Sequence, residues 1–165
     1  MTYVVWSKDL SVGIGVIDKQ HMRIVNYVNE LHDAINLPRD TRSHAGIITV
    51  VGDVIEYTES HFGFEEAMLE DAGYPFLKAH KKVHELFIRK MLDYKHRLDA
   101  GEDIAVELRE TLTRWLINHI KNEDTDYSRW VNKSDSQATP ESAKAKAQVH
   151  EEGWLRSRLT RFFGS

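Results

Sequence analysis

Five histidines and two acidic residues fall at positions from which their side chains could bind metal ions together. His61 and Glu65 are four residues apart, as are His80 and His84, and on a helix each pair would share one face. The remaining candidate ligands are His21, His119 and Asp124. The sequence contains no cysteine. A thiolate zinc site, an iron–sulfur cluster and a cysteine nucleophile are therefore excluded, and a transition metal would be held by imidazole and carboxylate.

Four stretches with helical periodicity place these side chains on inward faces. Apolar residues recur at alternating spacings of three and four, over about residues 17–37, 47–72, 77–100 and 104–132. Asp18 is the expected N-cap of the first helix, and Pro38 ends it. The connections are short, which favours antiparallel neighbours. We therefore predict an all-α protein, an up-down-up-down antiparallel four-helix bundle with an N-terminal extended arm and a C-terminal amphipathic tail.

The number of polar side chains in the predicted core favours a metal centre. A lone histidine on an apolar face is more often an ordinary core residue than a ligand. Each buried imidazole or carboxylate, however, costs a few kcal/mol unless it finds a partner, and here seven would share one core. Seven ligands overfill the roughly six positions of one octahedron and fit four-coordinate zinc badly. Two ions with one open coordination position are the better fit, and iron suits mixed imidazole and carboxylate ligands.

Three segments of the sequence resemble the bacterial hemerythrins: WSKDLSVGIGVIDKQH (6–21), HFGFEEAMLEDAGYPFLKAHKKVH (61–84) and WLINHIKNEDTDY (115–127). The resemblance covers about residues 3–132, and all seven ligand positions of the family pattern are filled. It implies two non-haem iron ions, bridged by an oxo or hydroxo group, that bind dioxygen reversibly. One iron would carry His80, His84 and His119. The other would carry His21 and His61 and keep the open position, and Glu65 and Asp124 would bridge the two.

The helix spacing and the family pattern disagree at one ligand. Asp124 follows His119 by five residues, a rotation of about 140° on an α-helix, whereas Glu123 is better aligned. Asp124 shares the inward stripe of Ile120 and Tyr127, and the family pattern places the carboxylate there. We therefore expect Asp124 to be the ligand and Glu123 to face solvent.

A reversible oxygen carrier also needs an apolar pocket that keeps water away from the bound ligand. By match to the family, the residues expected to line it are Ile24, Phe62, Trp115, Leu116 and Ile120. Ordinary core packing is the alternative role for each of them, and both roles can hold together. The four other histidines lie off the inward faces or in the tail and are interpreted as surface residues: His32, His44, His96 and His150.

The composition of the chain limits which partners and which cellular location we expect for the protein. The net charge of −4 argues against a nucleic-acid partner, which would require a basic face. No apolar stretch is long enough to span a bilayer, and Lys8 and Asp9 stand where a secretory signal would be apolar, so we expect a cytoplasmic protein.

We expect residues 1–132 to form the di-iron bundle and residues 133–165 to form a linker followed by a short basic amphipathic helix. The apolar and basic segment runs from Trp154 to Phe163. Such a segment can bind a protein partner or an anionic membrane surface, and folding back onto the bundle or disorder is the alternative. Our hypothesis is that it recruits the bundle to a specific site.

Reversible dioxygen binding, for delivery, storage or sensing, is the function expected from these features. A di-iron oxidase or peroxidase is the second possibility. Ferritin-like enzymes, however, use more carboxylates and Glu-x-x-His repeats, whereas this sequence has His-x-x-x-Glu and His-x-x-x-His. An interaction module that responds to oxygen or iron and acts through the tail is the third possibility.

Overall fold

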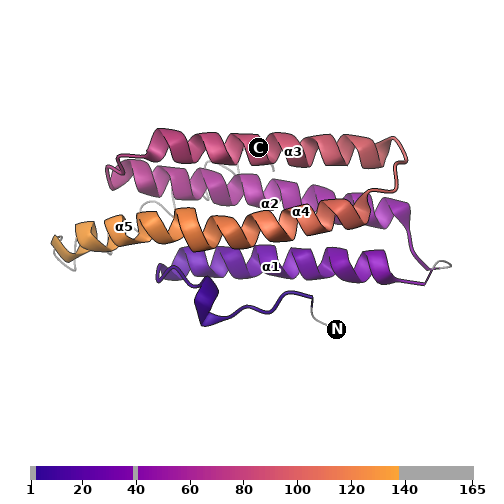
Figure 1. The fold of residues 1–165 in the computed structure, drawn as a ribbon, viewed down its shortest axis with the longest axis horizontal. Helices are drawn as coiled ribbons and strands as arrows, with labels where there is room; N and C mark the ends of the chain where they lie inside the picture. Colours follow the sequence, from indigo (N-terminus) through magenta and orange to yellow (C-terminus); the bar gives the residue numbers. More distant parts are fainter. Residues whose placement is uncertain (1–2, 39–40, 138–165) are drawn as a thin grey trace, which may run out of the picture.

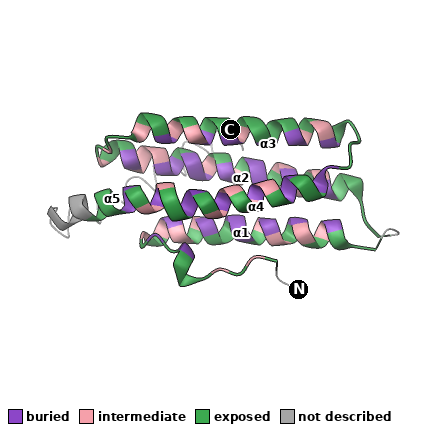
Figure 2. Ribbon diagram, in the orientation of Figure 1, coloured by how far each residue is buried: buried purple, intermediate pink, exposed green. Residues whose placement is uncertain are grey.

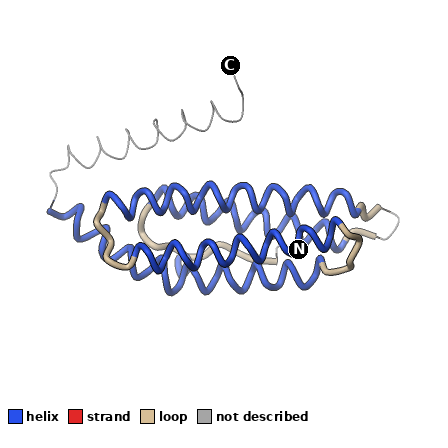
Figure 3. Tube along the Cα trace, turned by 90° about the horizontal axis from the view of Figure 1, so that it is seen from above, coloured by secondary structure: helices blue, strands red, loops and turns tan. Residues whose placement is uncertain are grey.

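Four long helices packed side by side make up the protein in the computed structural model, which describes residues 3–38 and 41–137 (Figure 1). They are α1 (Gly15–Asn36), α2 (His44–Asp71), α3 (Leu77–Asp99) and a fourth helix that begins as α4 (Ala105–His119). The fourth helix continues through a π-helical segment (Ile120–Asp124) into α5 (Thr125–Gln137). The loops lie at the helix ends and along the N-terminal arm, and the described residues contain no strand (Figure 3). The predicted all-α antiparallel four-helix bundle is confirmed.

Helix α5 runs to Gln137, five residues beyond the predicted end at 132. The predicted tail segment, Trp154 to Phe163, lies outside the described residues. Within the described part of the chain, no helix is long and apolar enough to cross a membrane.

The core follows the spacing that the sequence predicted. Buried residues form stripes on the helix faces that point toward the other helices (Figure 2). On α1, Ile17, Ile24 and Val28 are at most 1% exposed, and comparable stripes run along α2, α3 and α4. Burying one such side chain contributes about 1.5–3 kcal/mol. The polar ligand cluster therefore sits in a bundle held together mainly by apolar packing.

Local signals fix the turns between the helices. The Ser43 hydroxyl caps α2 by accepting a hydrogen bond from the N–H of Gly46 at 3.1 Å. Helices α2 and α3 each end at a glycine in the left-handed region, Gly73 (φ 65°) and Gly101 (φ 88°). A residue with a Cβ rarely adopts this conformation, which closes a helix with a bond back across the last turn. These sharp ends return the chain alongside the preceding helix.

The N-terminal arm is tied to α1 at two points. It runs along this helix in Figure 1, with a short 3-10 helix at Lys8–Leu10. The Asn29 side chain accepts hydrogen bonds from the N–H groups of Tyr3 and Val4 at 3.0 and 2.8 Å, and it donates one to the carbonyl of Val4 at 2.9 Å. The arm therefore pairs its backbone polar groups with a side chain of the bundle.

Asp18 is the second tie, and the prediction that it caps α1 is wrong. The helix begins at Gly15, so Asp18 lies inside its first turn. Its carboxylate accepts hydrogen bonds from the N–H of Val12 at 2.8 Å and from the hydroxyl of Ser11 at 2.6 Å. An acidic residue in the first turn also interacts favourably with the helix dipole. Asp18 therefore holds the arm rather than starting the helix.

Candidate metal centre

The topology brings all seven candidate ligands to one end of the bundle. His21 lies early in α1 and the His80/His84 pair early in α3, whereas the His61/Glu65 pair lies late in α2. The remaining two, His119 and Asp124, lie at the end of α4 and in the π-helical segment. Because neighbouring helices are antiparallel, the starts of α1 and α3 meet the later parts of α2 and of the fourth helix. All seven side chains are at most 5% exposed.

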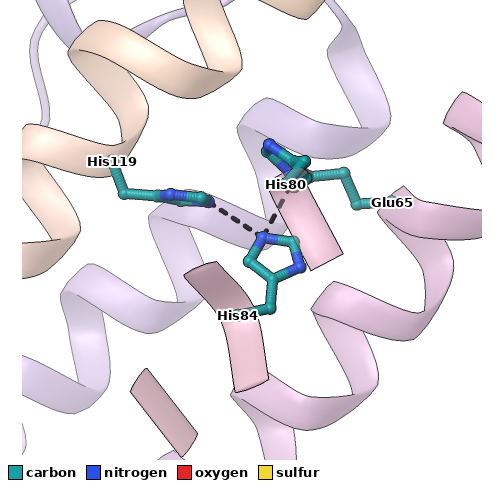
Figure 4. A group of neighbouring side chains, drawn as sticks. All are labelled: Glu65, His80, His84 and His119. Carbon is teal, nitrogen blue, oxygen red and sulfur yellow. Dashed lines mark hydrogen bonds and ion pairs between the residues drawn. The ribbon is translucent and has the colours of Figure 1, made fainter. Parts of the chain in front are cut away.

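Three histidines and one carboxylate form the first group. The side chains of Glu65, His80, His84 and His119 converge on a common point from α2, α3 and α4 (Figure 4). The Nε2 atom of His80 lies 2.5 Å from Glu65 Oε1, and the Nε2 atoms of His84 and His119 are 3.1 Å apart. One potential ligand atom from each of the four lies within 4.8 Å of the others.

Two histidines form the second group, and both carboxylates connect it to the first. His21, His61 and Glu65 also offer ligand atoms within 4.8 Å of one another. Glu65 turns Oε1 toward His80 and Oε2 toward His61 Nε2 at 3.2 Å. Asp124 turns Oδ1 toward His119 Nε2 at 3.0 Å and Oδ2 toward His21 Nε2 at 3.1 Å. Each carboxylate thus presents one oxygen to each histidine group.

The π-helical segment explains how Asp124 reaches the centre from five residues beyond His119. In a π-helix the hydrogen bonds span five residues instead of four, so each residue turns less about the helix axis and a side chain five positions on comes back toward the face of the first. The Thr125 N–H bonds to the carbonyl of Ile120, and the Thr125 hydroxyl donates to the same carbonyl at 2.9 Å. The conflict of helix spacing in the sequence disappears because the helix changes its pitch at this turn.

Three of the histidines are hydrogen-bonded on their outer ring nitrogen, Nδ1. His84 Nδ1 is paired with Glu66 Oε1 at 2.8 Å, and His119 Nδ1 is paired with the Glu123 carboxylate. His61 Nδ1 lies 2.8 Å from the amide oxygen of Gln20. Such partners fix the ring and leave Nε2 free to bind a metal. The expectation that Glu123 faces solvent is wrong in this respect, because its carboxylate turns back onto the histidine one helical turn before it.

Sequence reasoning did not find Gln20 or Glu66 either. Gln20 directly precedes the candidate ligand His21, and Glu66 directly follows Glu65. Each, however, forms its hydrogen bond with a histidine of another helix. Only Glu123, four residues after its histidine, carried a readable signal, namely the same-face spacing of a helix.

The buried polar atoms at the centre fit a metal. In the described part of the chain, the buried atoms without a hydrogen-bond partner include His21 Nε2, His61 Nε2, Glu65 Oε2 and both oxygens of Asp124. All five atoms face the interior of the cluster. Buried polar groups are normally satisfied, so a set of nitrogen and oxygen donors left over at one point matches the ligand set of a transition metal.

Burial and neighbouring charges shift the pKa values of several side chains in the cluster, and the pKa of Glu65 is raised by its burial and by the nearby Asp124. Burial lowers the pKa of His61 and of His84, which keeps both imidazoles neutral and able to bind an ion. Burial also lowers the pKa of His119, but the carboxylates of Asp124 and Glu123 outweigh this effect and raise it to about 10. Burial raises the pKa of Asp124, and the neighbouring His119 outweighs that and lowers it. An ion would have to displace the His119 proton.

Aromatic rings pack against the three-histidine group. Phe62 stacks on the His84 ring with centroids 3.6 Å apart, and Trp115 stacks on the His119 ring at 4.4 Å. Phe62 and Trp115 also meet edge to face at 5.6 Å. Three other residues predicted for the oxygen pocket are buried apolar side chains of the core: Ile24, Leu116 and Ile120.

The histidines interpreted as surface residues differ among themselves. His44 and His96 are exposed, as expected, and His44 Nε2 donates to the Leu98 carbonyl at 2.8 Å. His32 is half-buried because the Tyr3 ring stacks on it at 4.5 Å. His150 lies outside the described residues.

The chain is similar to known proteins along most of its length. The family model described as the hemerythrin HHE cation binding domain matches residues 12–131. A bacteriohemerythrin of Pseudomonas aeruginosa is 47% identical over 164 residues, covering 99% of this chain and all of the relative. A bacteriohemerythrin of Stenotrophomonas maltophilia is 44% identical over the same coverage. A crystal structure of wild-type hemerythrin superposes with a TM-score of 0.71 at 27% identity, over 78% of this chain and 98% of that one.

The similarity to the Pseudomonas and Stenotrophomonas proteins extends beyond the bundle, since an alignment of 164 residues includes most of residues 138–165. A bacteriohemerythrin of Methylococcus capsulatus, at 30% identity, covers 77% of this chain. With the family model spanning the bundle and relatives matching along almost its whole length, the chain belongs to the hemerythrin family.

Proposed function

We propose that this protein holds two iron ions and binds dioxygen reversibly, for delivery, storage or sensing. The observation that carries the proposal is the position of Glu65 and Asp124, each with one oxygen toward the three-histidine group and the other toward the two-histidine group. A single ion would use one oxygen of each carboxylate and leave the other buried without a partner. Two ions use all four.

The seven side chains then divide between the two positions. The proposed ligands of the first iron are His80, His84 and His119, and those of the second are His21 and His61. Glu65 and Asp124 would hold both ions, together with an oxo or hydroxo group. The second position has one protein ligand fewer, which leaves room there for a small molecule. When bound, the iron pair supplies two electrons to dioxygen and recovers them on release.

The chain's own contribution to reversibility is the exclusion of water. Ile24, Leu116 and Ile120 are between 1% and 3% exposed, and we assign to them the apolar wall of the oxygen pocket. Phe62 and Trp115 stack on His84 and His119, so in addition to the pocket role they would fix the orientation of two ligand rings. A dry, apolar surrounding slows the loss of bound oxygen to solvent.

The test is optical and quantitative. Iron-loaded, reduced protein should contain two irons per chain, gain a visible ligand-to-metal charge-transfer band in air and lose it under inert gas over repeated cycles. A band that bleaches irreversibly while an added organic substrate is consumed would contradict the carrier function and indicate a di-iron oxidase. Fewer than two irons per chain would contradict the site itself.

We further propose that the protein acts in the cytoplasm and that the segment from Trp154 to Phe163 recruits it to a protein partner or a membrane surface. The support is the composition of that segment, which combines apolar residues at helical spacing with three arginines and no acidic residue. Its length, about ten residues, favours a partner over a membrane, because little apolar area would be buried.

A further inference from the structure

The two histidine groups differ in what binds their outer nitrogens. In the three-histidine group, two Nδ1 atoms meet carboxylates, with Glu66 Oε1 2.8 Å from His84 and the Glu123 carboxylate on His119. In the two-histidine group, His61 Nδ1 meets the neutral amide oxygen of Gln20 at 2.8 Å. The Nδ1 atom of His21 is buried and has no hydrogen-bond partner. Carboxylates thus lie behind the outer nitrogens of one group only.

A carboxylate behind an imidazole changes the metal in front of it. The hydrogen bond from Nδ1–H to a carboxylate draws the proton away from the ring and raises the basicity of Nε2, whereas an amide oxygen does this far less. A more basic, more anionic ligand set binds a cation more tightly. It also favours the higher oxidation state, because Fe(III) gains more than Fe(II) from added negative charge.

We propose that Glu66 and Glu123 make the three-histidine position the tighter-binding and the more easily oxidised of the two iron positions, and that Gln20 keeps the other position weaker and easier to reduce. The proposal rests on the proposed di-iron function. Glu66 and Glu123 act through His84 and His119 and are positioning residues. The position with the free coordination site would then be the one held less tightly.

Three single substitutions that preserve side-chain shape test the proposal. Glu66→Gln and Glu123→Gln remove the charge on the three-histidine group, and Gln20→Glu adds one to the two-histidine group. Glu85→Gln is the matched control, since it removes the same charge from the groove that Glu66 also lines. Glu85 pairs with Lys82 at 2.8 Å and forms no hydrogen bond or ion pair with any histidine of the described residues.

The first measurement is the release of Fe(II) from the anaerobic, fully loaded protein to an excess of a ferrous chelator. Glu66→Gln and Glu123→Gln should each speed the slow phase, which is one iron per chain, by about tenfold, the usual effect of removing such a partner. Gln20→Glu should slow the fast phase by a similar factor. Glu85→Gln should change neither phase.

The second measurement is stepwise oxidation of the diferrous protein with ferricyanide, which takes one electron from each iron and becomes ferrocyanide. The lower of the two midpoint potentials should rise in Glu66→Gln and Glu123→Gln, and the higher one should fall in Gln20→Glu. These opposite directions distinguish an electronic role from a loss of packing, which would loosen the iron in all three variants.

Equal shifts at both irons, or shifts no larger than those of Glu85→Gln, would overturn the inference while leaving the di-iron proposal intact. A Gln20→Glu variant that releases its iron faster would overturn it as well. A wild-type protein that binds fewer than two irons would overturn the proposed function and this inference with it.

Discussion

Removing the metal should lower the free energy of unfolding of the bundle. The size of the loss depends on how many buried polar atoms are left without a partner. Five atoms of His21, His61, Glu65 and Asp124 face the centre of the cluster without a hydrogen bond. A buried polar atom left unsatisfied costs about 1–3 kcal/mol. We use the lower end, because all five also lie 3.0–3.2 Å from an opposite partner in a histidine–carboxylate contact. The sum is then about 5 kcal/mol, a large part of the roughly 5–15 kcal/mol that stabilises a typical domain.

The assay is thermal unfolding, followed by circular dichroism, of anaerobic iron-loaded protein and of the same protein after chelation and dialysis. For a chain of this size, about 2–4 °C of Tm corresponds to 1 kcal/mol, so the chelated protein should melt about 10–20 °C lower. Reloading with Fe(II) should restore the Tm in a concentration-dependent way. Magnesium is the control ion, because it prefers oxygen ligands and should restore little.

A difference of less than about 3 °C between the two forms would refute the reasoning, since it corresponds to at most roughly 1.5 kcal/mol. The unpaired atoms would then not be costly, and the argument that their burial requires a metal would fail. Full restoration by magnesium would refute the assignment of an imidazole-rich site.

Four further predictions concern single regions of the chain. His80→Ala or Glu65→Ala should abolish loading with two irons, measured as iron per chain. Two irons retained in either variant would contradict the ligand assignment. Leu116→Ala should keep both irons but shorten the lifetime of the oxygenated form in the visible spectrum, because water enters the pocket. It should also lower the free energy of unfolding, measured by chemical denaturation, by about 2–5 kcal/mol. An unchanged lifetime in both Leu116→Ala and Trp115→Ala would contradict the pocket assignment. Asn29→Ala should remove the three hydrogen bonds to Tyr3 and Val4 and expose the arm to limited proteolysis, with iron content unchanged; equal resistance to protease would show that Asn29 does not hold the arm. Truncation after Gln137, where α5 ends, should preserve iron content and the reversible band but abolish partner co-purification or localisation, and a destabilised bundle would instead make the tail part of the fold.

The bundle could be predicted because apolar residues recur at regular spacings along the sequence. Apolar residues at spacings of three and four define an inward face whatever the other helices do, and Gly73 and Gly101 carry the turns that bring the helices back. The same periodicity placed the seven polar side chains on inward faces. It failed at Asp18, since a carboxylate near a helix start can cap the helix or hold a preceding loop, and only the position of Ser11 and Val12 decides between the two.

Side-chain contacts between helices could not be predicted from the sequence. Gln20 and Glu66 bind histidines that are 41 and 18 residues away, so no local spacing marks them. Glu123 was assigned to solvent by an exclusive choice between it and Asp124 for one inward position. The π-helical segment makes that choice unnecessary, because the wider turn brings Asp124 to the centre while Glu123 stays within reach of His119 Nδ1.

The π-helical segment therefore supplies a carboxylate to each ring nitrogen of one histidine. His119 meets Asp124 on its Nε2 side and Glu123 on its Nδ1 side, although the two acidic residues are neighbours in the chain. In a regular α-helix, neighbouring residues point about 100° apart, and only one of them could share the face of His119. Widening one turn costs some backbone hydrogen-bond geometry, which is why such turns are rare outside functional sites. Here the cost is offset by placing two carboxylates on opposite nitrogens of the same imidazole ring.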